Sequence, residues 1–215
     1  MSLPPLLNIW EILDIHAISL SVHITRKVGG STGSSFPSNG RVQKDLTLAR
    51  TASRALRIEE VEIKVPEDHQ LILGQAHFIK TVEDLYETIV SSMPSIKFGL
   101  AFCEASGKAL VRSDGSSSQL EGLAKEYALK IGAGHIFVVV LDGAFPINVV
   151  NRIKAVEEVL QVYCATSNRV TVVVADNEVG RGVLGVIDGV KPKGAEGSQD
   201  VEERRAFLRK IGYKR

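Results

Sequence analysis

The sequence predicts an α/β fold, specifically a three-layer α/β/α sandwich built around a mixed sheet. From about residue 60 onward, short aliphatic runs alternate with segments of helical periodicity, which is typical of helices layered on a sheet. The 215 residues are 44% hydrophobic and 24% charged, an ordinary composition for a globular domain. Strands and helices also follow a similar order in residues 70–131 and 136–211, which suggests an internal duplication.

The N-terminal part of the chain differs in composition from the rest. Residues 25–57 contain seven Lys or Arg against one acid, Asp45, and are rich in Ser, Gly and Thr without hydrophobic periodicity. Such a composition is typical of a flexible segment. A transit peptide is an alternative, although the apolar residues ahead of this segment fit one poorly. We therefore predict that residues 1–57 are a flexible or non-native extension, and that residues 58–215 form the functional domain.

The strands are predicted from short apolar runs that are bounded by glycine or polar residues. They are expected at residues 61–65, 70–79, 96–104, 108–112, 136–141, 160–164, 170–175 and 182–188.

Two helices are expected in the first half of the domain. One begins at Thr81, an apparent N-cap with Asp84 three residues later, and ends before Pro94. The other has apolar residues at steps of three and four over residues 120–131 and stops at Gly132.

Two more helices are expected in the second half. The first starts near Pro146 and uses Val149 and Ile153 as its apolar face. The second lies at the C-terminus, in the charged segment DVEERRAFLRKIGYKR, and is predicted to dock on the surface through Phe207, Leu208 and Ile211.

Charge and cysteine content exclude several classes of protein. The 26 basic and 25 acidic residues leave a net charge of +1, which argues against nucleic acid as a main partner. Cys103 and Cys164 both lie in apolar segments, so we expect two buried, reduced thiols rather than a disulfide or a zinc site. No run of about 18 apolar residues occurs, so no membrane span is expected. We expect a cytoplasmic protein.

Five segments are richer in glycine and polar residues than the ends of strands require. They are residues 74–81, 103–108, 132–135, 142–151 and 177–182. In α/β sheets, ligands bind beyond the strand ends and beside helix N-termini. These segments are therefore where we expect chemistry.

The first three segments contain candidate catalytic and charged side chains. His77 and Lys80 precede a helix start, Glu104 and Lys108 flank a short turn, and His135 follows the glycines of GAGH. Each has a purely structural alternative: His77 as a hydrogen-bonded strand residue, and residues 105–108 as a hairpin turn.

The last two segments contain candidate nucleotide contacts. Asp142 follows a buried strand, and Asn148 and Asn151 are three residues apart on a predicted helix, where they share a face. Arg181 and Gly182 belong to a glycine-rich loop in which the guanidinium could fork onto a phosphate. The structural alternatives are solvent-facing asparagines and a tight hairpin with an exposed arginine.

Several motifs taken together resemble the adenosine-specific kinase family of archaeal and bacterial proteins. They are GQAHFIKTVEDLYE, IKFGLAFCEASGKALVR, KIGAGHIFVVVLDGAFPINVVN, VYCATSN, GRGVLGVIDG and FLRKIGYKR, which run from about residue 60 to 215. The resemblance implies an α/β/α domain that binds adenosine or AMP and that carries a phosphoryl group on a histidine. The family's histidine motifs match at His77 and His135, and the sequence does not choose between them.

The resemblance leads to a mechanistic hypothesis and two alternatives. A histidine would accept a phosphoryl group and pass it to a ribose hydroxyl of adenosine. Charge would be neutralised by Lys80, Lys108 or Arg181, while Glu104 or Asp142 would orient the hydroxyl or hold Mg²⁺; the phosphate donor is not predicted. The alternatives are a non-catalytic adenosine or AMP sensor, and a metal-dependent hydrolase with His77, His135 and Glu104 as ligands. We also expect a homo-oligomer.

Overall fold

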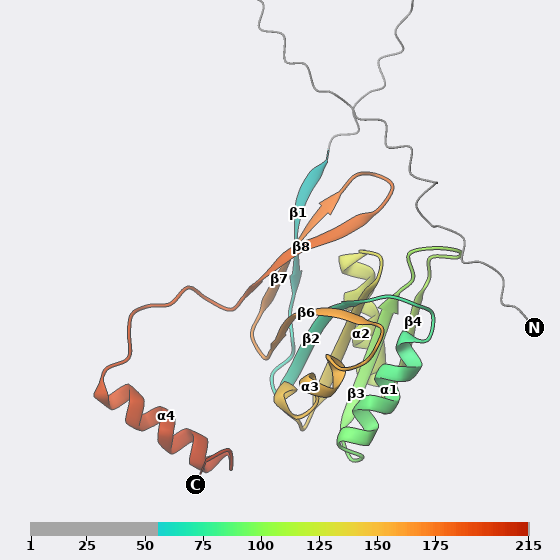
Figure 1. The fold of residues 1–215 in the computed structure, drawn as a ribbon. Coiled ribbons are helices and arrows are strands. Elements are labelled where there is room, and N and C mark those ends of the chain that lie inside the picture. The colour runs from blue at the N-terminus through green and yellow to red at the C-terminus, as the bar shows by residue number, and fades with distance from the viewer. Residues whose placement is uncertain (1–55, 215) are drawn as a thin grey trace, which may run out of the picture. The chain divides into compact units, whose positions relative to one another are not determined.

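Two antiparallel sheets and four α-helices make up the part of the chain that the structure describes, residues 56–214 (Figure 1). The structure is a computed structural model. The α/β class predicted from the sequence is confirmed. The prediction of a flexible N-terminal extension falls almost entirely on residues 1–55, which lie outside the described residues.

The larger sheet has five strands in the order β4-β3-β5-β2-β6. Their bounds are β2 His69–Ala76, β3 Lys97–Cys103, β4 Val111–Gly115, β5 Ile136–Asp142 and β6 Val159–Thr166. Strands β3 and β5 are buried along almost their whole length, which explains why their sequences are unbroken apolar runs.

The expected mixed sheet is wrong, because each strand pair in the described residues is antiparallel. Strands β2 and β3 are joined through helix α1 (Thr81–Ser92) and run in the same direction, but they do not pair with each other. Strand β5 lies between them and is antiparallel to both. A mixed sheet would contain parallel neighbours, but here β5 is inserted between the two strands that run in the same direction.

The smaller sheet has three strands in the order β1-β7-β8. Their bounds are β1 Arg57–Ile63, β7 Val170–Asp176 and β8 Arg181–Asp188. The β7–β8 connection is a short hairpin turn, which is one of the two alternatives that the sequence left open for residues 177–182. Strand β1 pairs in register with β7, from Arg57 opposite Asp176 to Ile63 opposite Val170.

The helices agree with most of the sequence predictions. Helix α2 spans Ser118–Ile131 and ends at Gly132, whose φ of 62° is the left-handed conformation that favours glycine. The expected N-cap role of Thr81 is wrong. Lys80 is the capping residue of α1, and the Thr81 hydroxyl instead donates to the carbonyls of His77 and Phe78.

The last two helices are short or exposed. Beyond β5 lie a 3₁₀ turn, η2 (Pro146–Asn148), and a one-turn helix, α3 (Val150–Ile153). Val149 and Ile153 are buried, as the apolar pattern predicted. Helix α4 (Ser198–Lys210) has no buried residue.

Two buried clusters pack against opposite faces of the five-stranded sheet. One joins α1 and α3 to that sheet through residues such as Leu85, Phe98 and Ile153. The other joins α2 and the three-stranded sheet to it through residues such as Ala124 and Val172. Because strands share the second face with α2, a three-layer sandwich of helices is not confirmed. An internal duplication is not confirmed either, since the first half contributes to one sheet and the second half to both.

Both cysteines are buried free thiols in the structure, as predicted. Within residues 56–214, no helix is both long enough and apolar enough to cross a membrane.

Candidate functional site

Three of the predicted catalytic residues lie at one edge of the five-stranded sheet, meaning the side where its strands begin and end and not an outer strand. Strands β2 and β3 end at this edge and the antiparallel β5 begins there, so His77, Glu104 and His135 each stand one residue beyond a strand terminus. Backbone hydrogen bonds join the three strand ends: the His135 N–H donates to Cys103 O at 2.8 Å, and the Ala76 N–H donates to His135 O at 2.9 Å.

A cavity of about 410 Å³ opens at this edge. It is lined by Phe78, Ile79, Phe102, Glu104, Ala105, Ser106, Gly107 and His135. Its walls combine aromatic and aliphatic side chains with one carboxylate and one imidazole. Mostly apolar walls with a few polar groups, in a volume of this size, are typical of a small-molecule site. We call this space the His135 cavity.

His135 has an unusual backbone conformation at the mouth of β5. Its φ is 63°, in the left-handed region, which is uncommon for a residue other than glycine. Its imidazole stacks on Phe102, with ring centroids 6.1 Å apart and an interplanar angle of 10°. A strained backbone that persists at a cavity wall is typical of a functional residue.

His77 lies in a different environment from His135. Its side chain is exposed, and it is not among the residues that line the His135 cavity. Its backbone N–H donates to Glu158 O at 2.9 Å. The next residue, Phe78, has a φ of 80° and contributes to the cavity wall. The structure therefore separates two histidines whose sequence contexts are similar.

Arg112, on β4, is a residue that the sequence reasoning missed. Its guanidinium donates to the carbonyl of Ile79 and to the carboxylate of Glu83, the latter at 2.6 Å, and its Nε lies 3.8 Å from a carboxylate oxygen of Glu104. It thus connects two walls of the His135 cavity. The signal that identifies it is the hairpin register, which pairs Arg112 with Phe102.

Two cations that were predicted to bind phosphate already have carboxylate partners. The Lys80 ammonium is bonded to Asp84 and Glu158, and these two hydrogen bonds raise its pKa. Arg181 donates from Nε to Asp176 and from a terminal nitrogen to Glu59, both at 2.7 Å.

Arg181 lies at the C-terminal end of helix α2. It also donates to the carbonyl of Ile131 at 3.4 Å. The guanidinium therefore ties the three-stranded sheet to the last turn of this helix.

The other predicted nucleotide contacts lie elsewhere. Asp142 ends β5, so six residue steps of about 3.4 Å each place it roughly 20 Å from the His135 end of that strand. Asn148 and Asn151 follow on η2 and α3, and Asn148 donates to the Tyr213 hydroxyl at 3.1 Å. Asp142 is thus too far from Glu104 to share a ligand with it.

Lys108 and Gly182 also lie outside the walls of the His135 cavity. Lys108 is exposed in the turn between β3 and β4, next to Gly107, and Gly182 is on β8.

A second cavity of about 410 Å³ shares Glu104 and Ala105 with the lining of the first. It is lined by Cys103, Glu104, Ala105, Ala109, Val111, Ala128, Leu129, Gly132, Ala133, Gly134, Val179, Gly180 and Arg181. A Cβ at Gly134 would lie 2.8 Å from the Cβ of Ala105, so the wall between the two cavities requires glycine there. Residues at the C-terminal end of α2 and the Arg181 side chain both line this space.

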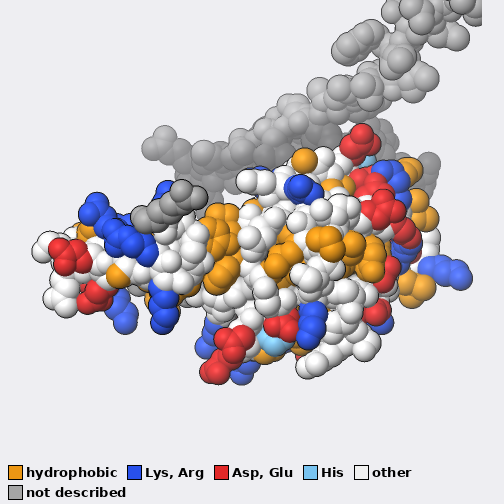
Figure 2. Space-filling view, turned by 90° about the horizontal axis from the view of Figure 1, so that it is seen from below, with side chains coloured by type: hydrophobic (Ala, Val, Ile, Leu, Met, Phe, Trp, Pro, Cys, Tyr) orange, Lys and Arg blue, Asp and Glu red, His pale blue; other side chains and the backbone are white. Residues whose placement is uncertain are grey.

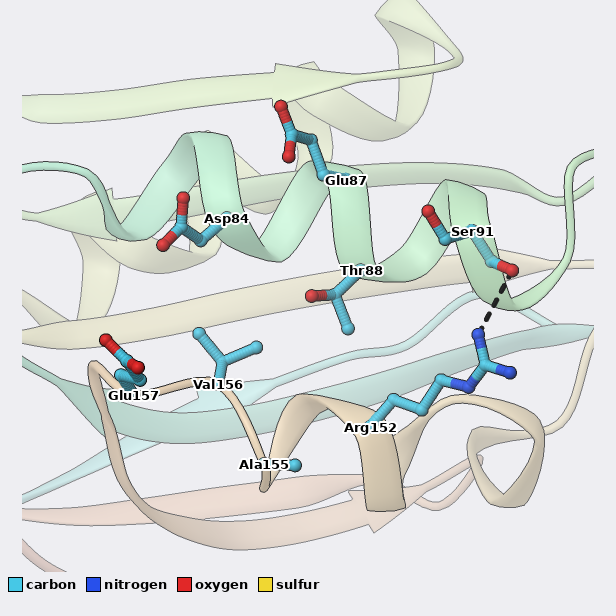
Figure 3. A pocket seen from close by; sticks show the side chains of 8 residues that line it. All are labelled: Asp84, Glu87, Thr88, Ser91, Arg152, Ala155, Val156 and Glu157. Carbon is cyan, nitrogen blue, oxygen red and sulfur yellow. Dashed lines mark hydrogen bonds between the residues drawn. The ribbon is translucent and has the colours of Figure 1, made fainter.

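Two further surface features contain none of the predicted catalytic residues. A groove of about 520 Å³ runs between α1 and the α3 region, and Figure 3 shows Glu87, Thr88 and Ser91 along one side of it and Arg152 donating to the Ser91 carbonyl from the other. Large hydrophobic side chains such as Phe145 and Ile147 are exposed, and Figure 2 shows hydrophobic side chains gathered on one face among charged ones.

The possible metal ligands do not cluster in the described part of the chain. Across residues 56–214, no three His, Cys, Asp or Glu side chains lie close enough together to hold a metal ion. The proposed ligand set of His77, His135 and Glu104 therefore does not form a dedicated metal site in this part of the chain.

The fold and the cavity define a class of protein: an α/β domain with a cavity at the edge of its sheet, of a size and lining typical of small-molecule sites. The profile of one family, described as adenosine specific kinase, matches residues 61–214. The chain belongs to this family, so the resemblance noted in the sequence is confirmed.

A solved structure is also similar to the chain. The crystal structure of the PH1918 protein from Pyrococcus horikoshii OT3 is 44% identical in sequence, with a TM-score of 0.71 over 75% of this chain and 99% of that one. No curated protein matches the chain.

Proposed function

We propose that the chain binds adenosine in the His135 cavity and transfers a phosphoryl group to a ribose hydroxyl. One observation carries the proposal: the cavity brings an imidazole, a carboxylate and two aromatic side chains together at one strand edge, in a chain that belongs to the adenosine specific kinase family. An aromatic side chain such as Phe78 suits the flat purine, because purines stack well on aromatic rings.

His135 is the residue proposed to carry the phosphoryl group. Its imidazole nitrogen would attack the terminal phosphorus of the donor, and the bond from that phosphorus to the leaving oxygen would break. A ribose hydroxyl oxygen would then attack the phosphorus, displace the imidazole and lose its proton. Glu104, which lines the same cavity, would orient that hydroxyl and accept its proton. Mg²⁺ stays a prediction, with Glu104 as the cavity carboxylate that would hold it together with donor phosphates.

A non-catalytic adenosine or AMP sensor is the second candidate. It is favoured by the pairing of Lys80 and Arg181 with carboxylates, since cations so engaged contribute little to binding a polyphosphate donor. In this alternative the same cavity binds the nucleoside, and His135 donates or accepts a hydrogen bond without forming a covalent bond.

The test is to incubate the purified chain with adenosine and ATP labelled on the terminal phosphate, with Mg²⁺ or Mn²⁺, and to measure labelled AMP. Formation of AMP, together with acid-labile label on the protein, supports the kinase proposal. Binding of adenosine by calorimetry without AMP under any of these conditions supports the sensor. If adenosine does not bind, the kinase proposal fails, and if AMP does not bind either, the sensor fails as well.

AMP as the product, a cytoplasmic location, a homo-oligomeric state and the absence of a nucleic-acid partner stay predictions of the sequence.

A further inference from the structure

Glu158 is a buried carboxylate next to the candidate site. It immediately precedes β6 and is 3% exposed. One of its carboxylate oxygens contacts the Lys80 ammonium. The other, Oε2, is buried and has no hydrogen-bond partner among the described residues.

This arrangement is a poor way to stabilise a fold. Removing a carboxylate from water has a large free-energy cost, which a single ion pair offsets only when the remaining lone pairs are also satisfied. The Lys80 side chain is 46% exposed, so its attraction to Glu158 is weakened by solvent. A well-packed apolar residue would stabilise this position at least as well. The residue therefore requires an explanation other than stability.

Glu158 holds both ends of the four-residue segment from His77 to Lys80. Its backbone carbonyl accepts the His77 N–H at 2.9 Å, and its carboxylate binds the Lys80 ammonium. The two residues between these points, Phe78 and Ile79, form one wall of the His135 cavity. Glu158 alone thus holds both ends of the segment that forms this wall.

Few contacts other than those with Glu158 hold the Phe78–Ile79 wall in place. Phe78 and Ile79 are 58% and 65% exposed, so apolar packing contributes little. The φ of 80° at Phe78 is a conformation that is strained in a non-glycine residue and persists only when its surroundings impose it. Besides Glu158, the polar contacts on this segment are the Thr81 hydroxyl and amide, which donate to its carbonyls, Arg112, which donates to the Ile79 carbonyl, and Asp84, which also binds the Lys80 ammonium.

We infer that Glu158 is a positioning residue that fixes the Phe78–Ile79 wall through Lys80 and through the His77 amide. It acts on the ligand through this wall and does not touch the ligand. The inference rests on the proposed function, because it assigns the wall to the nucleoside. It predicts that the negative charge of Glu158 sets the affinity for adenosine while leaving the chemistry at His135 unchanged.

The first test is Glu158→Gln, which keeps the size of the side chain and the backbone carbonyl but removes the charge. We expect the Kd for adenosine to rise about tenfold, and, where turnover is measured, KM to rise with kcat unchanged. The matched control is Glu157→Gln, since Glu157 is the neighbouring carboxylate, is exposed and lies in the α1–α3 groove. The control should bind adenosine as the wild type does.

Lys80 variants separate positioning from general destabilisation. Lys80→Arg keeps the ion pair and should retain the wild-type affinity, whereas Lys80→Met should lose as much affinity as Glu158→Gln. If the two residues act through each other, the double variant Lys80→Met/Glu158→Gln is no worse than either single variant. Additive losses would overturn the inference.

Amide hydrogen exchange distinguishes a failure of this inference from a failure of the proposed function. Residues 77–80 should exchange faster in Glu158→Gln than in Glu157→Gln, whether or not adenosine binds. Unchanged exchange overturns the positioning role. Faster exchange with an unchanged Kd overturns its role in adenosine binding. Faster exchange in a protein whose wild type binds no adenosine overturns the proposed function, and with it the assignment of this wall to a nucleoside.

Discussion

At the scale of single residues, backbone conformation distinguishes His135 from His77. Both histidines follow a glycine-containing segment and precede apolar residues. Only His135 enters its strand with a φ of 63°, stacks on Phe102 and lines the cavity. The sequence could place both residues at strand ends, but it could not rank them, because the difference arises from how β3 and β5 pair over a long separation in the chain.

The role of His135 is tested by His135→Asn. Asparagine tolerates the left-handed backbone better than other non-glycine residues, so the cavity wall should keep its shape. Because the imidazole nucleophile is lost, we expect phosphoryl transfer to adenosine to fall at least about 100-fold while adenosine binding is retained. Labelled AMP formation and calorimetric Kd values measure the two effects.

The companion variant is His77→Asn, which changes an exposed imidazole outside the cavity. If His135 carries the phosphoryl group, acid-labile label stays on this variant and disappears from His135→Asn. The reverse pattern would assign the phosphoryl group to His77 and would contradict the proposed role of His135.

The charged residues show a second limit of sequence reasoning at this scale. Lys80 and Arg181 were predicted to bind phosphate from their places beside a helix start and in a glycine-rich loop. The pairing of Lys80 with Asp84 was readable as an i, i+4 pair, and that of Arg181 with Asp176 as a hairpin pair. The partners Glu158 and Glu59 are 78 and 122 positions away in the sequence, so only the fold reveals them.

At the scale of elements, the eight predicted strands all occur, most with ends within about two residues of prediction. Burial explains this success, since β3 and β5 are apolar along their lengths and must be inside. The third helix was predicted less accurately, because the segment that starts at Pro146 forms a 3₁₀ turn and only one turn of α-helix. The order of the strands could not be predicted from the sequence. The large distance between Asp142 and Glu104 was therefore not predicted.

The packing of helix α2 on β3 depends on Gly99. A Cβ at this position would lie 2.0 Å from the backbone of Leu120, so Gly99→Ala must push the helix away from the sheet. We expect it to lower the free energy of unfolding by about 1–3 kcal/mol or more. Urea unfolding followed by circular dichroism measures the change.

The matched control for this prediction is Gly122→Ala, on helix α2 itself. No atom lies within 4 Å of its Cβ position, and alanine favours a helix over glycine by about 0.5–1 kcal/mol. We therefore expect Gly122→Ala to raise stability. Equal effects of the two substitutions would contradict the close packing of α2 on β3.

At the scale of the whole molecule, the two thiols make stability depend on alkaline pH. Burial raises the pKa of Cys103 and of Cys164 from 9.0 to about 11, with the charge of Asp188 adding to the shift at Cys164. The folded state therefore keeps protons that the unfolded state loses. This stabilisation is complete below about pH 9 and is lost as the pH rises toward 11, by about 1.4 kcal/mol per unit of pKa shift.

The measurement is the free energy of unfolding at pH 8 and pH 10 for the wild type and for Cys103→Ala/Cys164→Ala. The wild type should lose more stability over this range than the double variant, even though the variant is less stable at both values. Burial also raises the pKa of Tyr127 and Tyr163, which affects both proteins equally. An identical pH dependence in the two proteins would contradict burial of the thiols.

Adenosine is proposed to bind in the cavity between His135 and the Phe78–Ile79 wall. A crystal structure of the chain with adenosine tests it most directly. We expect the nucleoside at this edge of the five-stranded sheet, with its purine against Phe78 and a ribose hydroxyl within hydrogen-bond distance of Glu104. Adenosine at the opposite edge, beside Asp142 and Asn148, or in the second cavity beside Arg181, would contradict the claim.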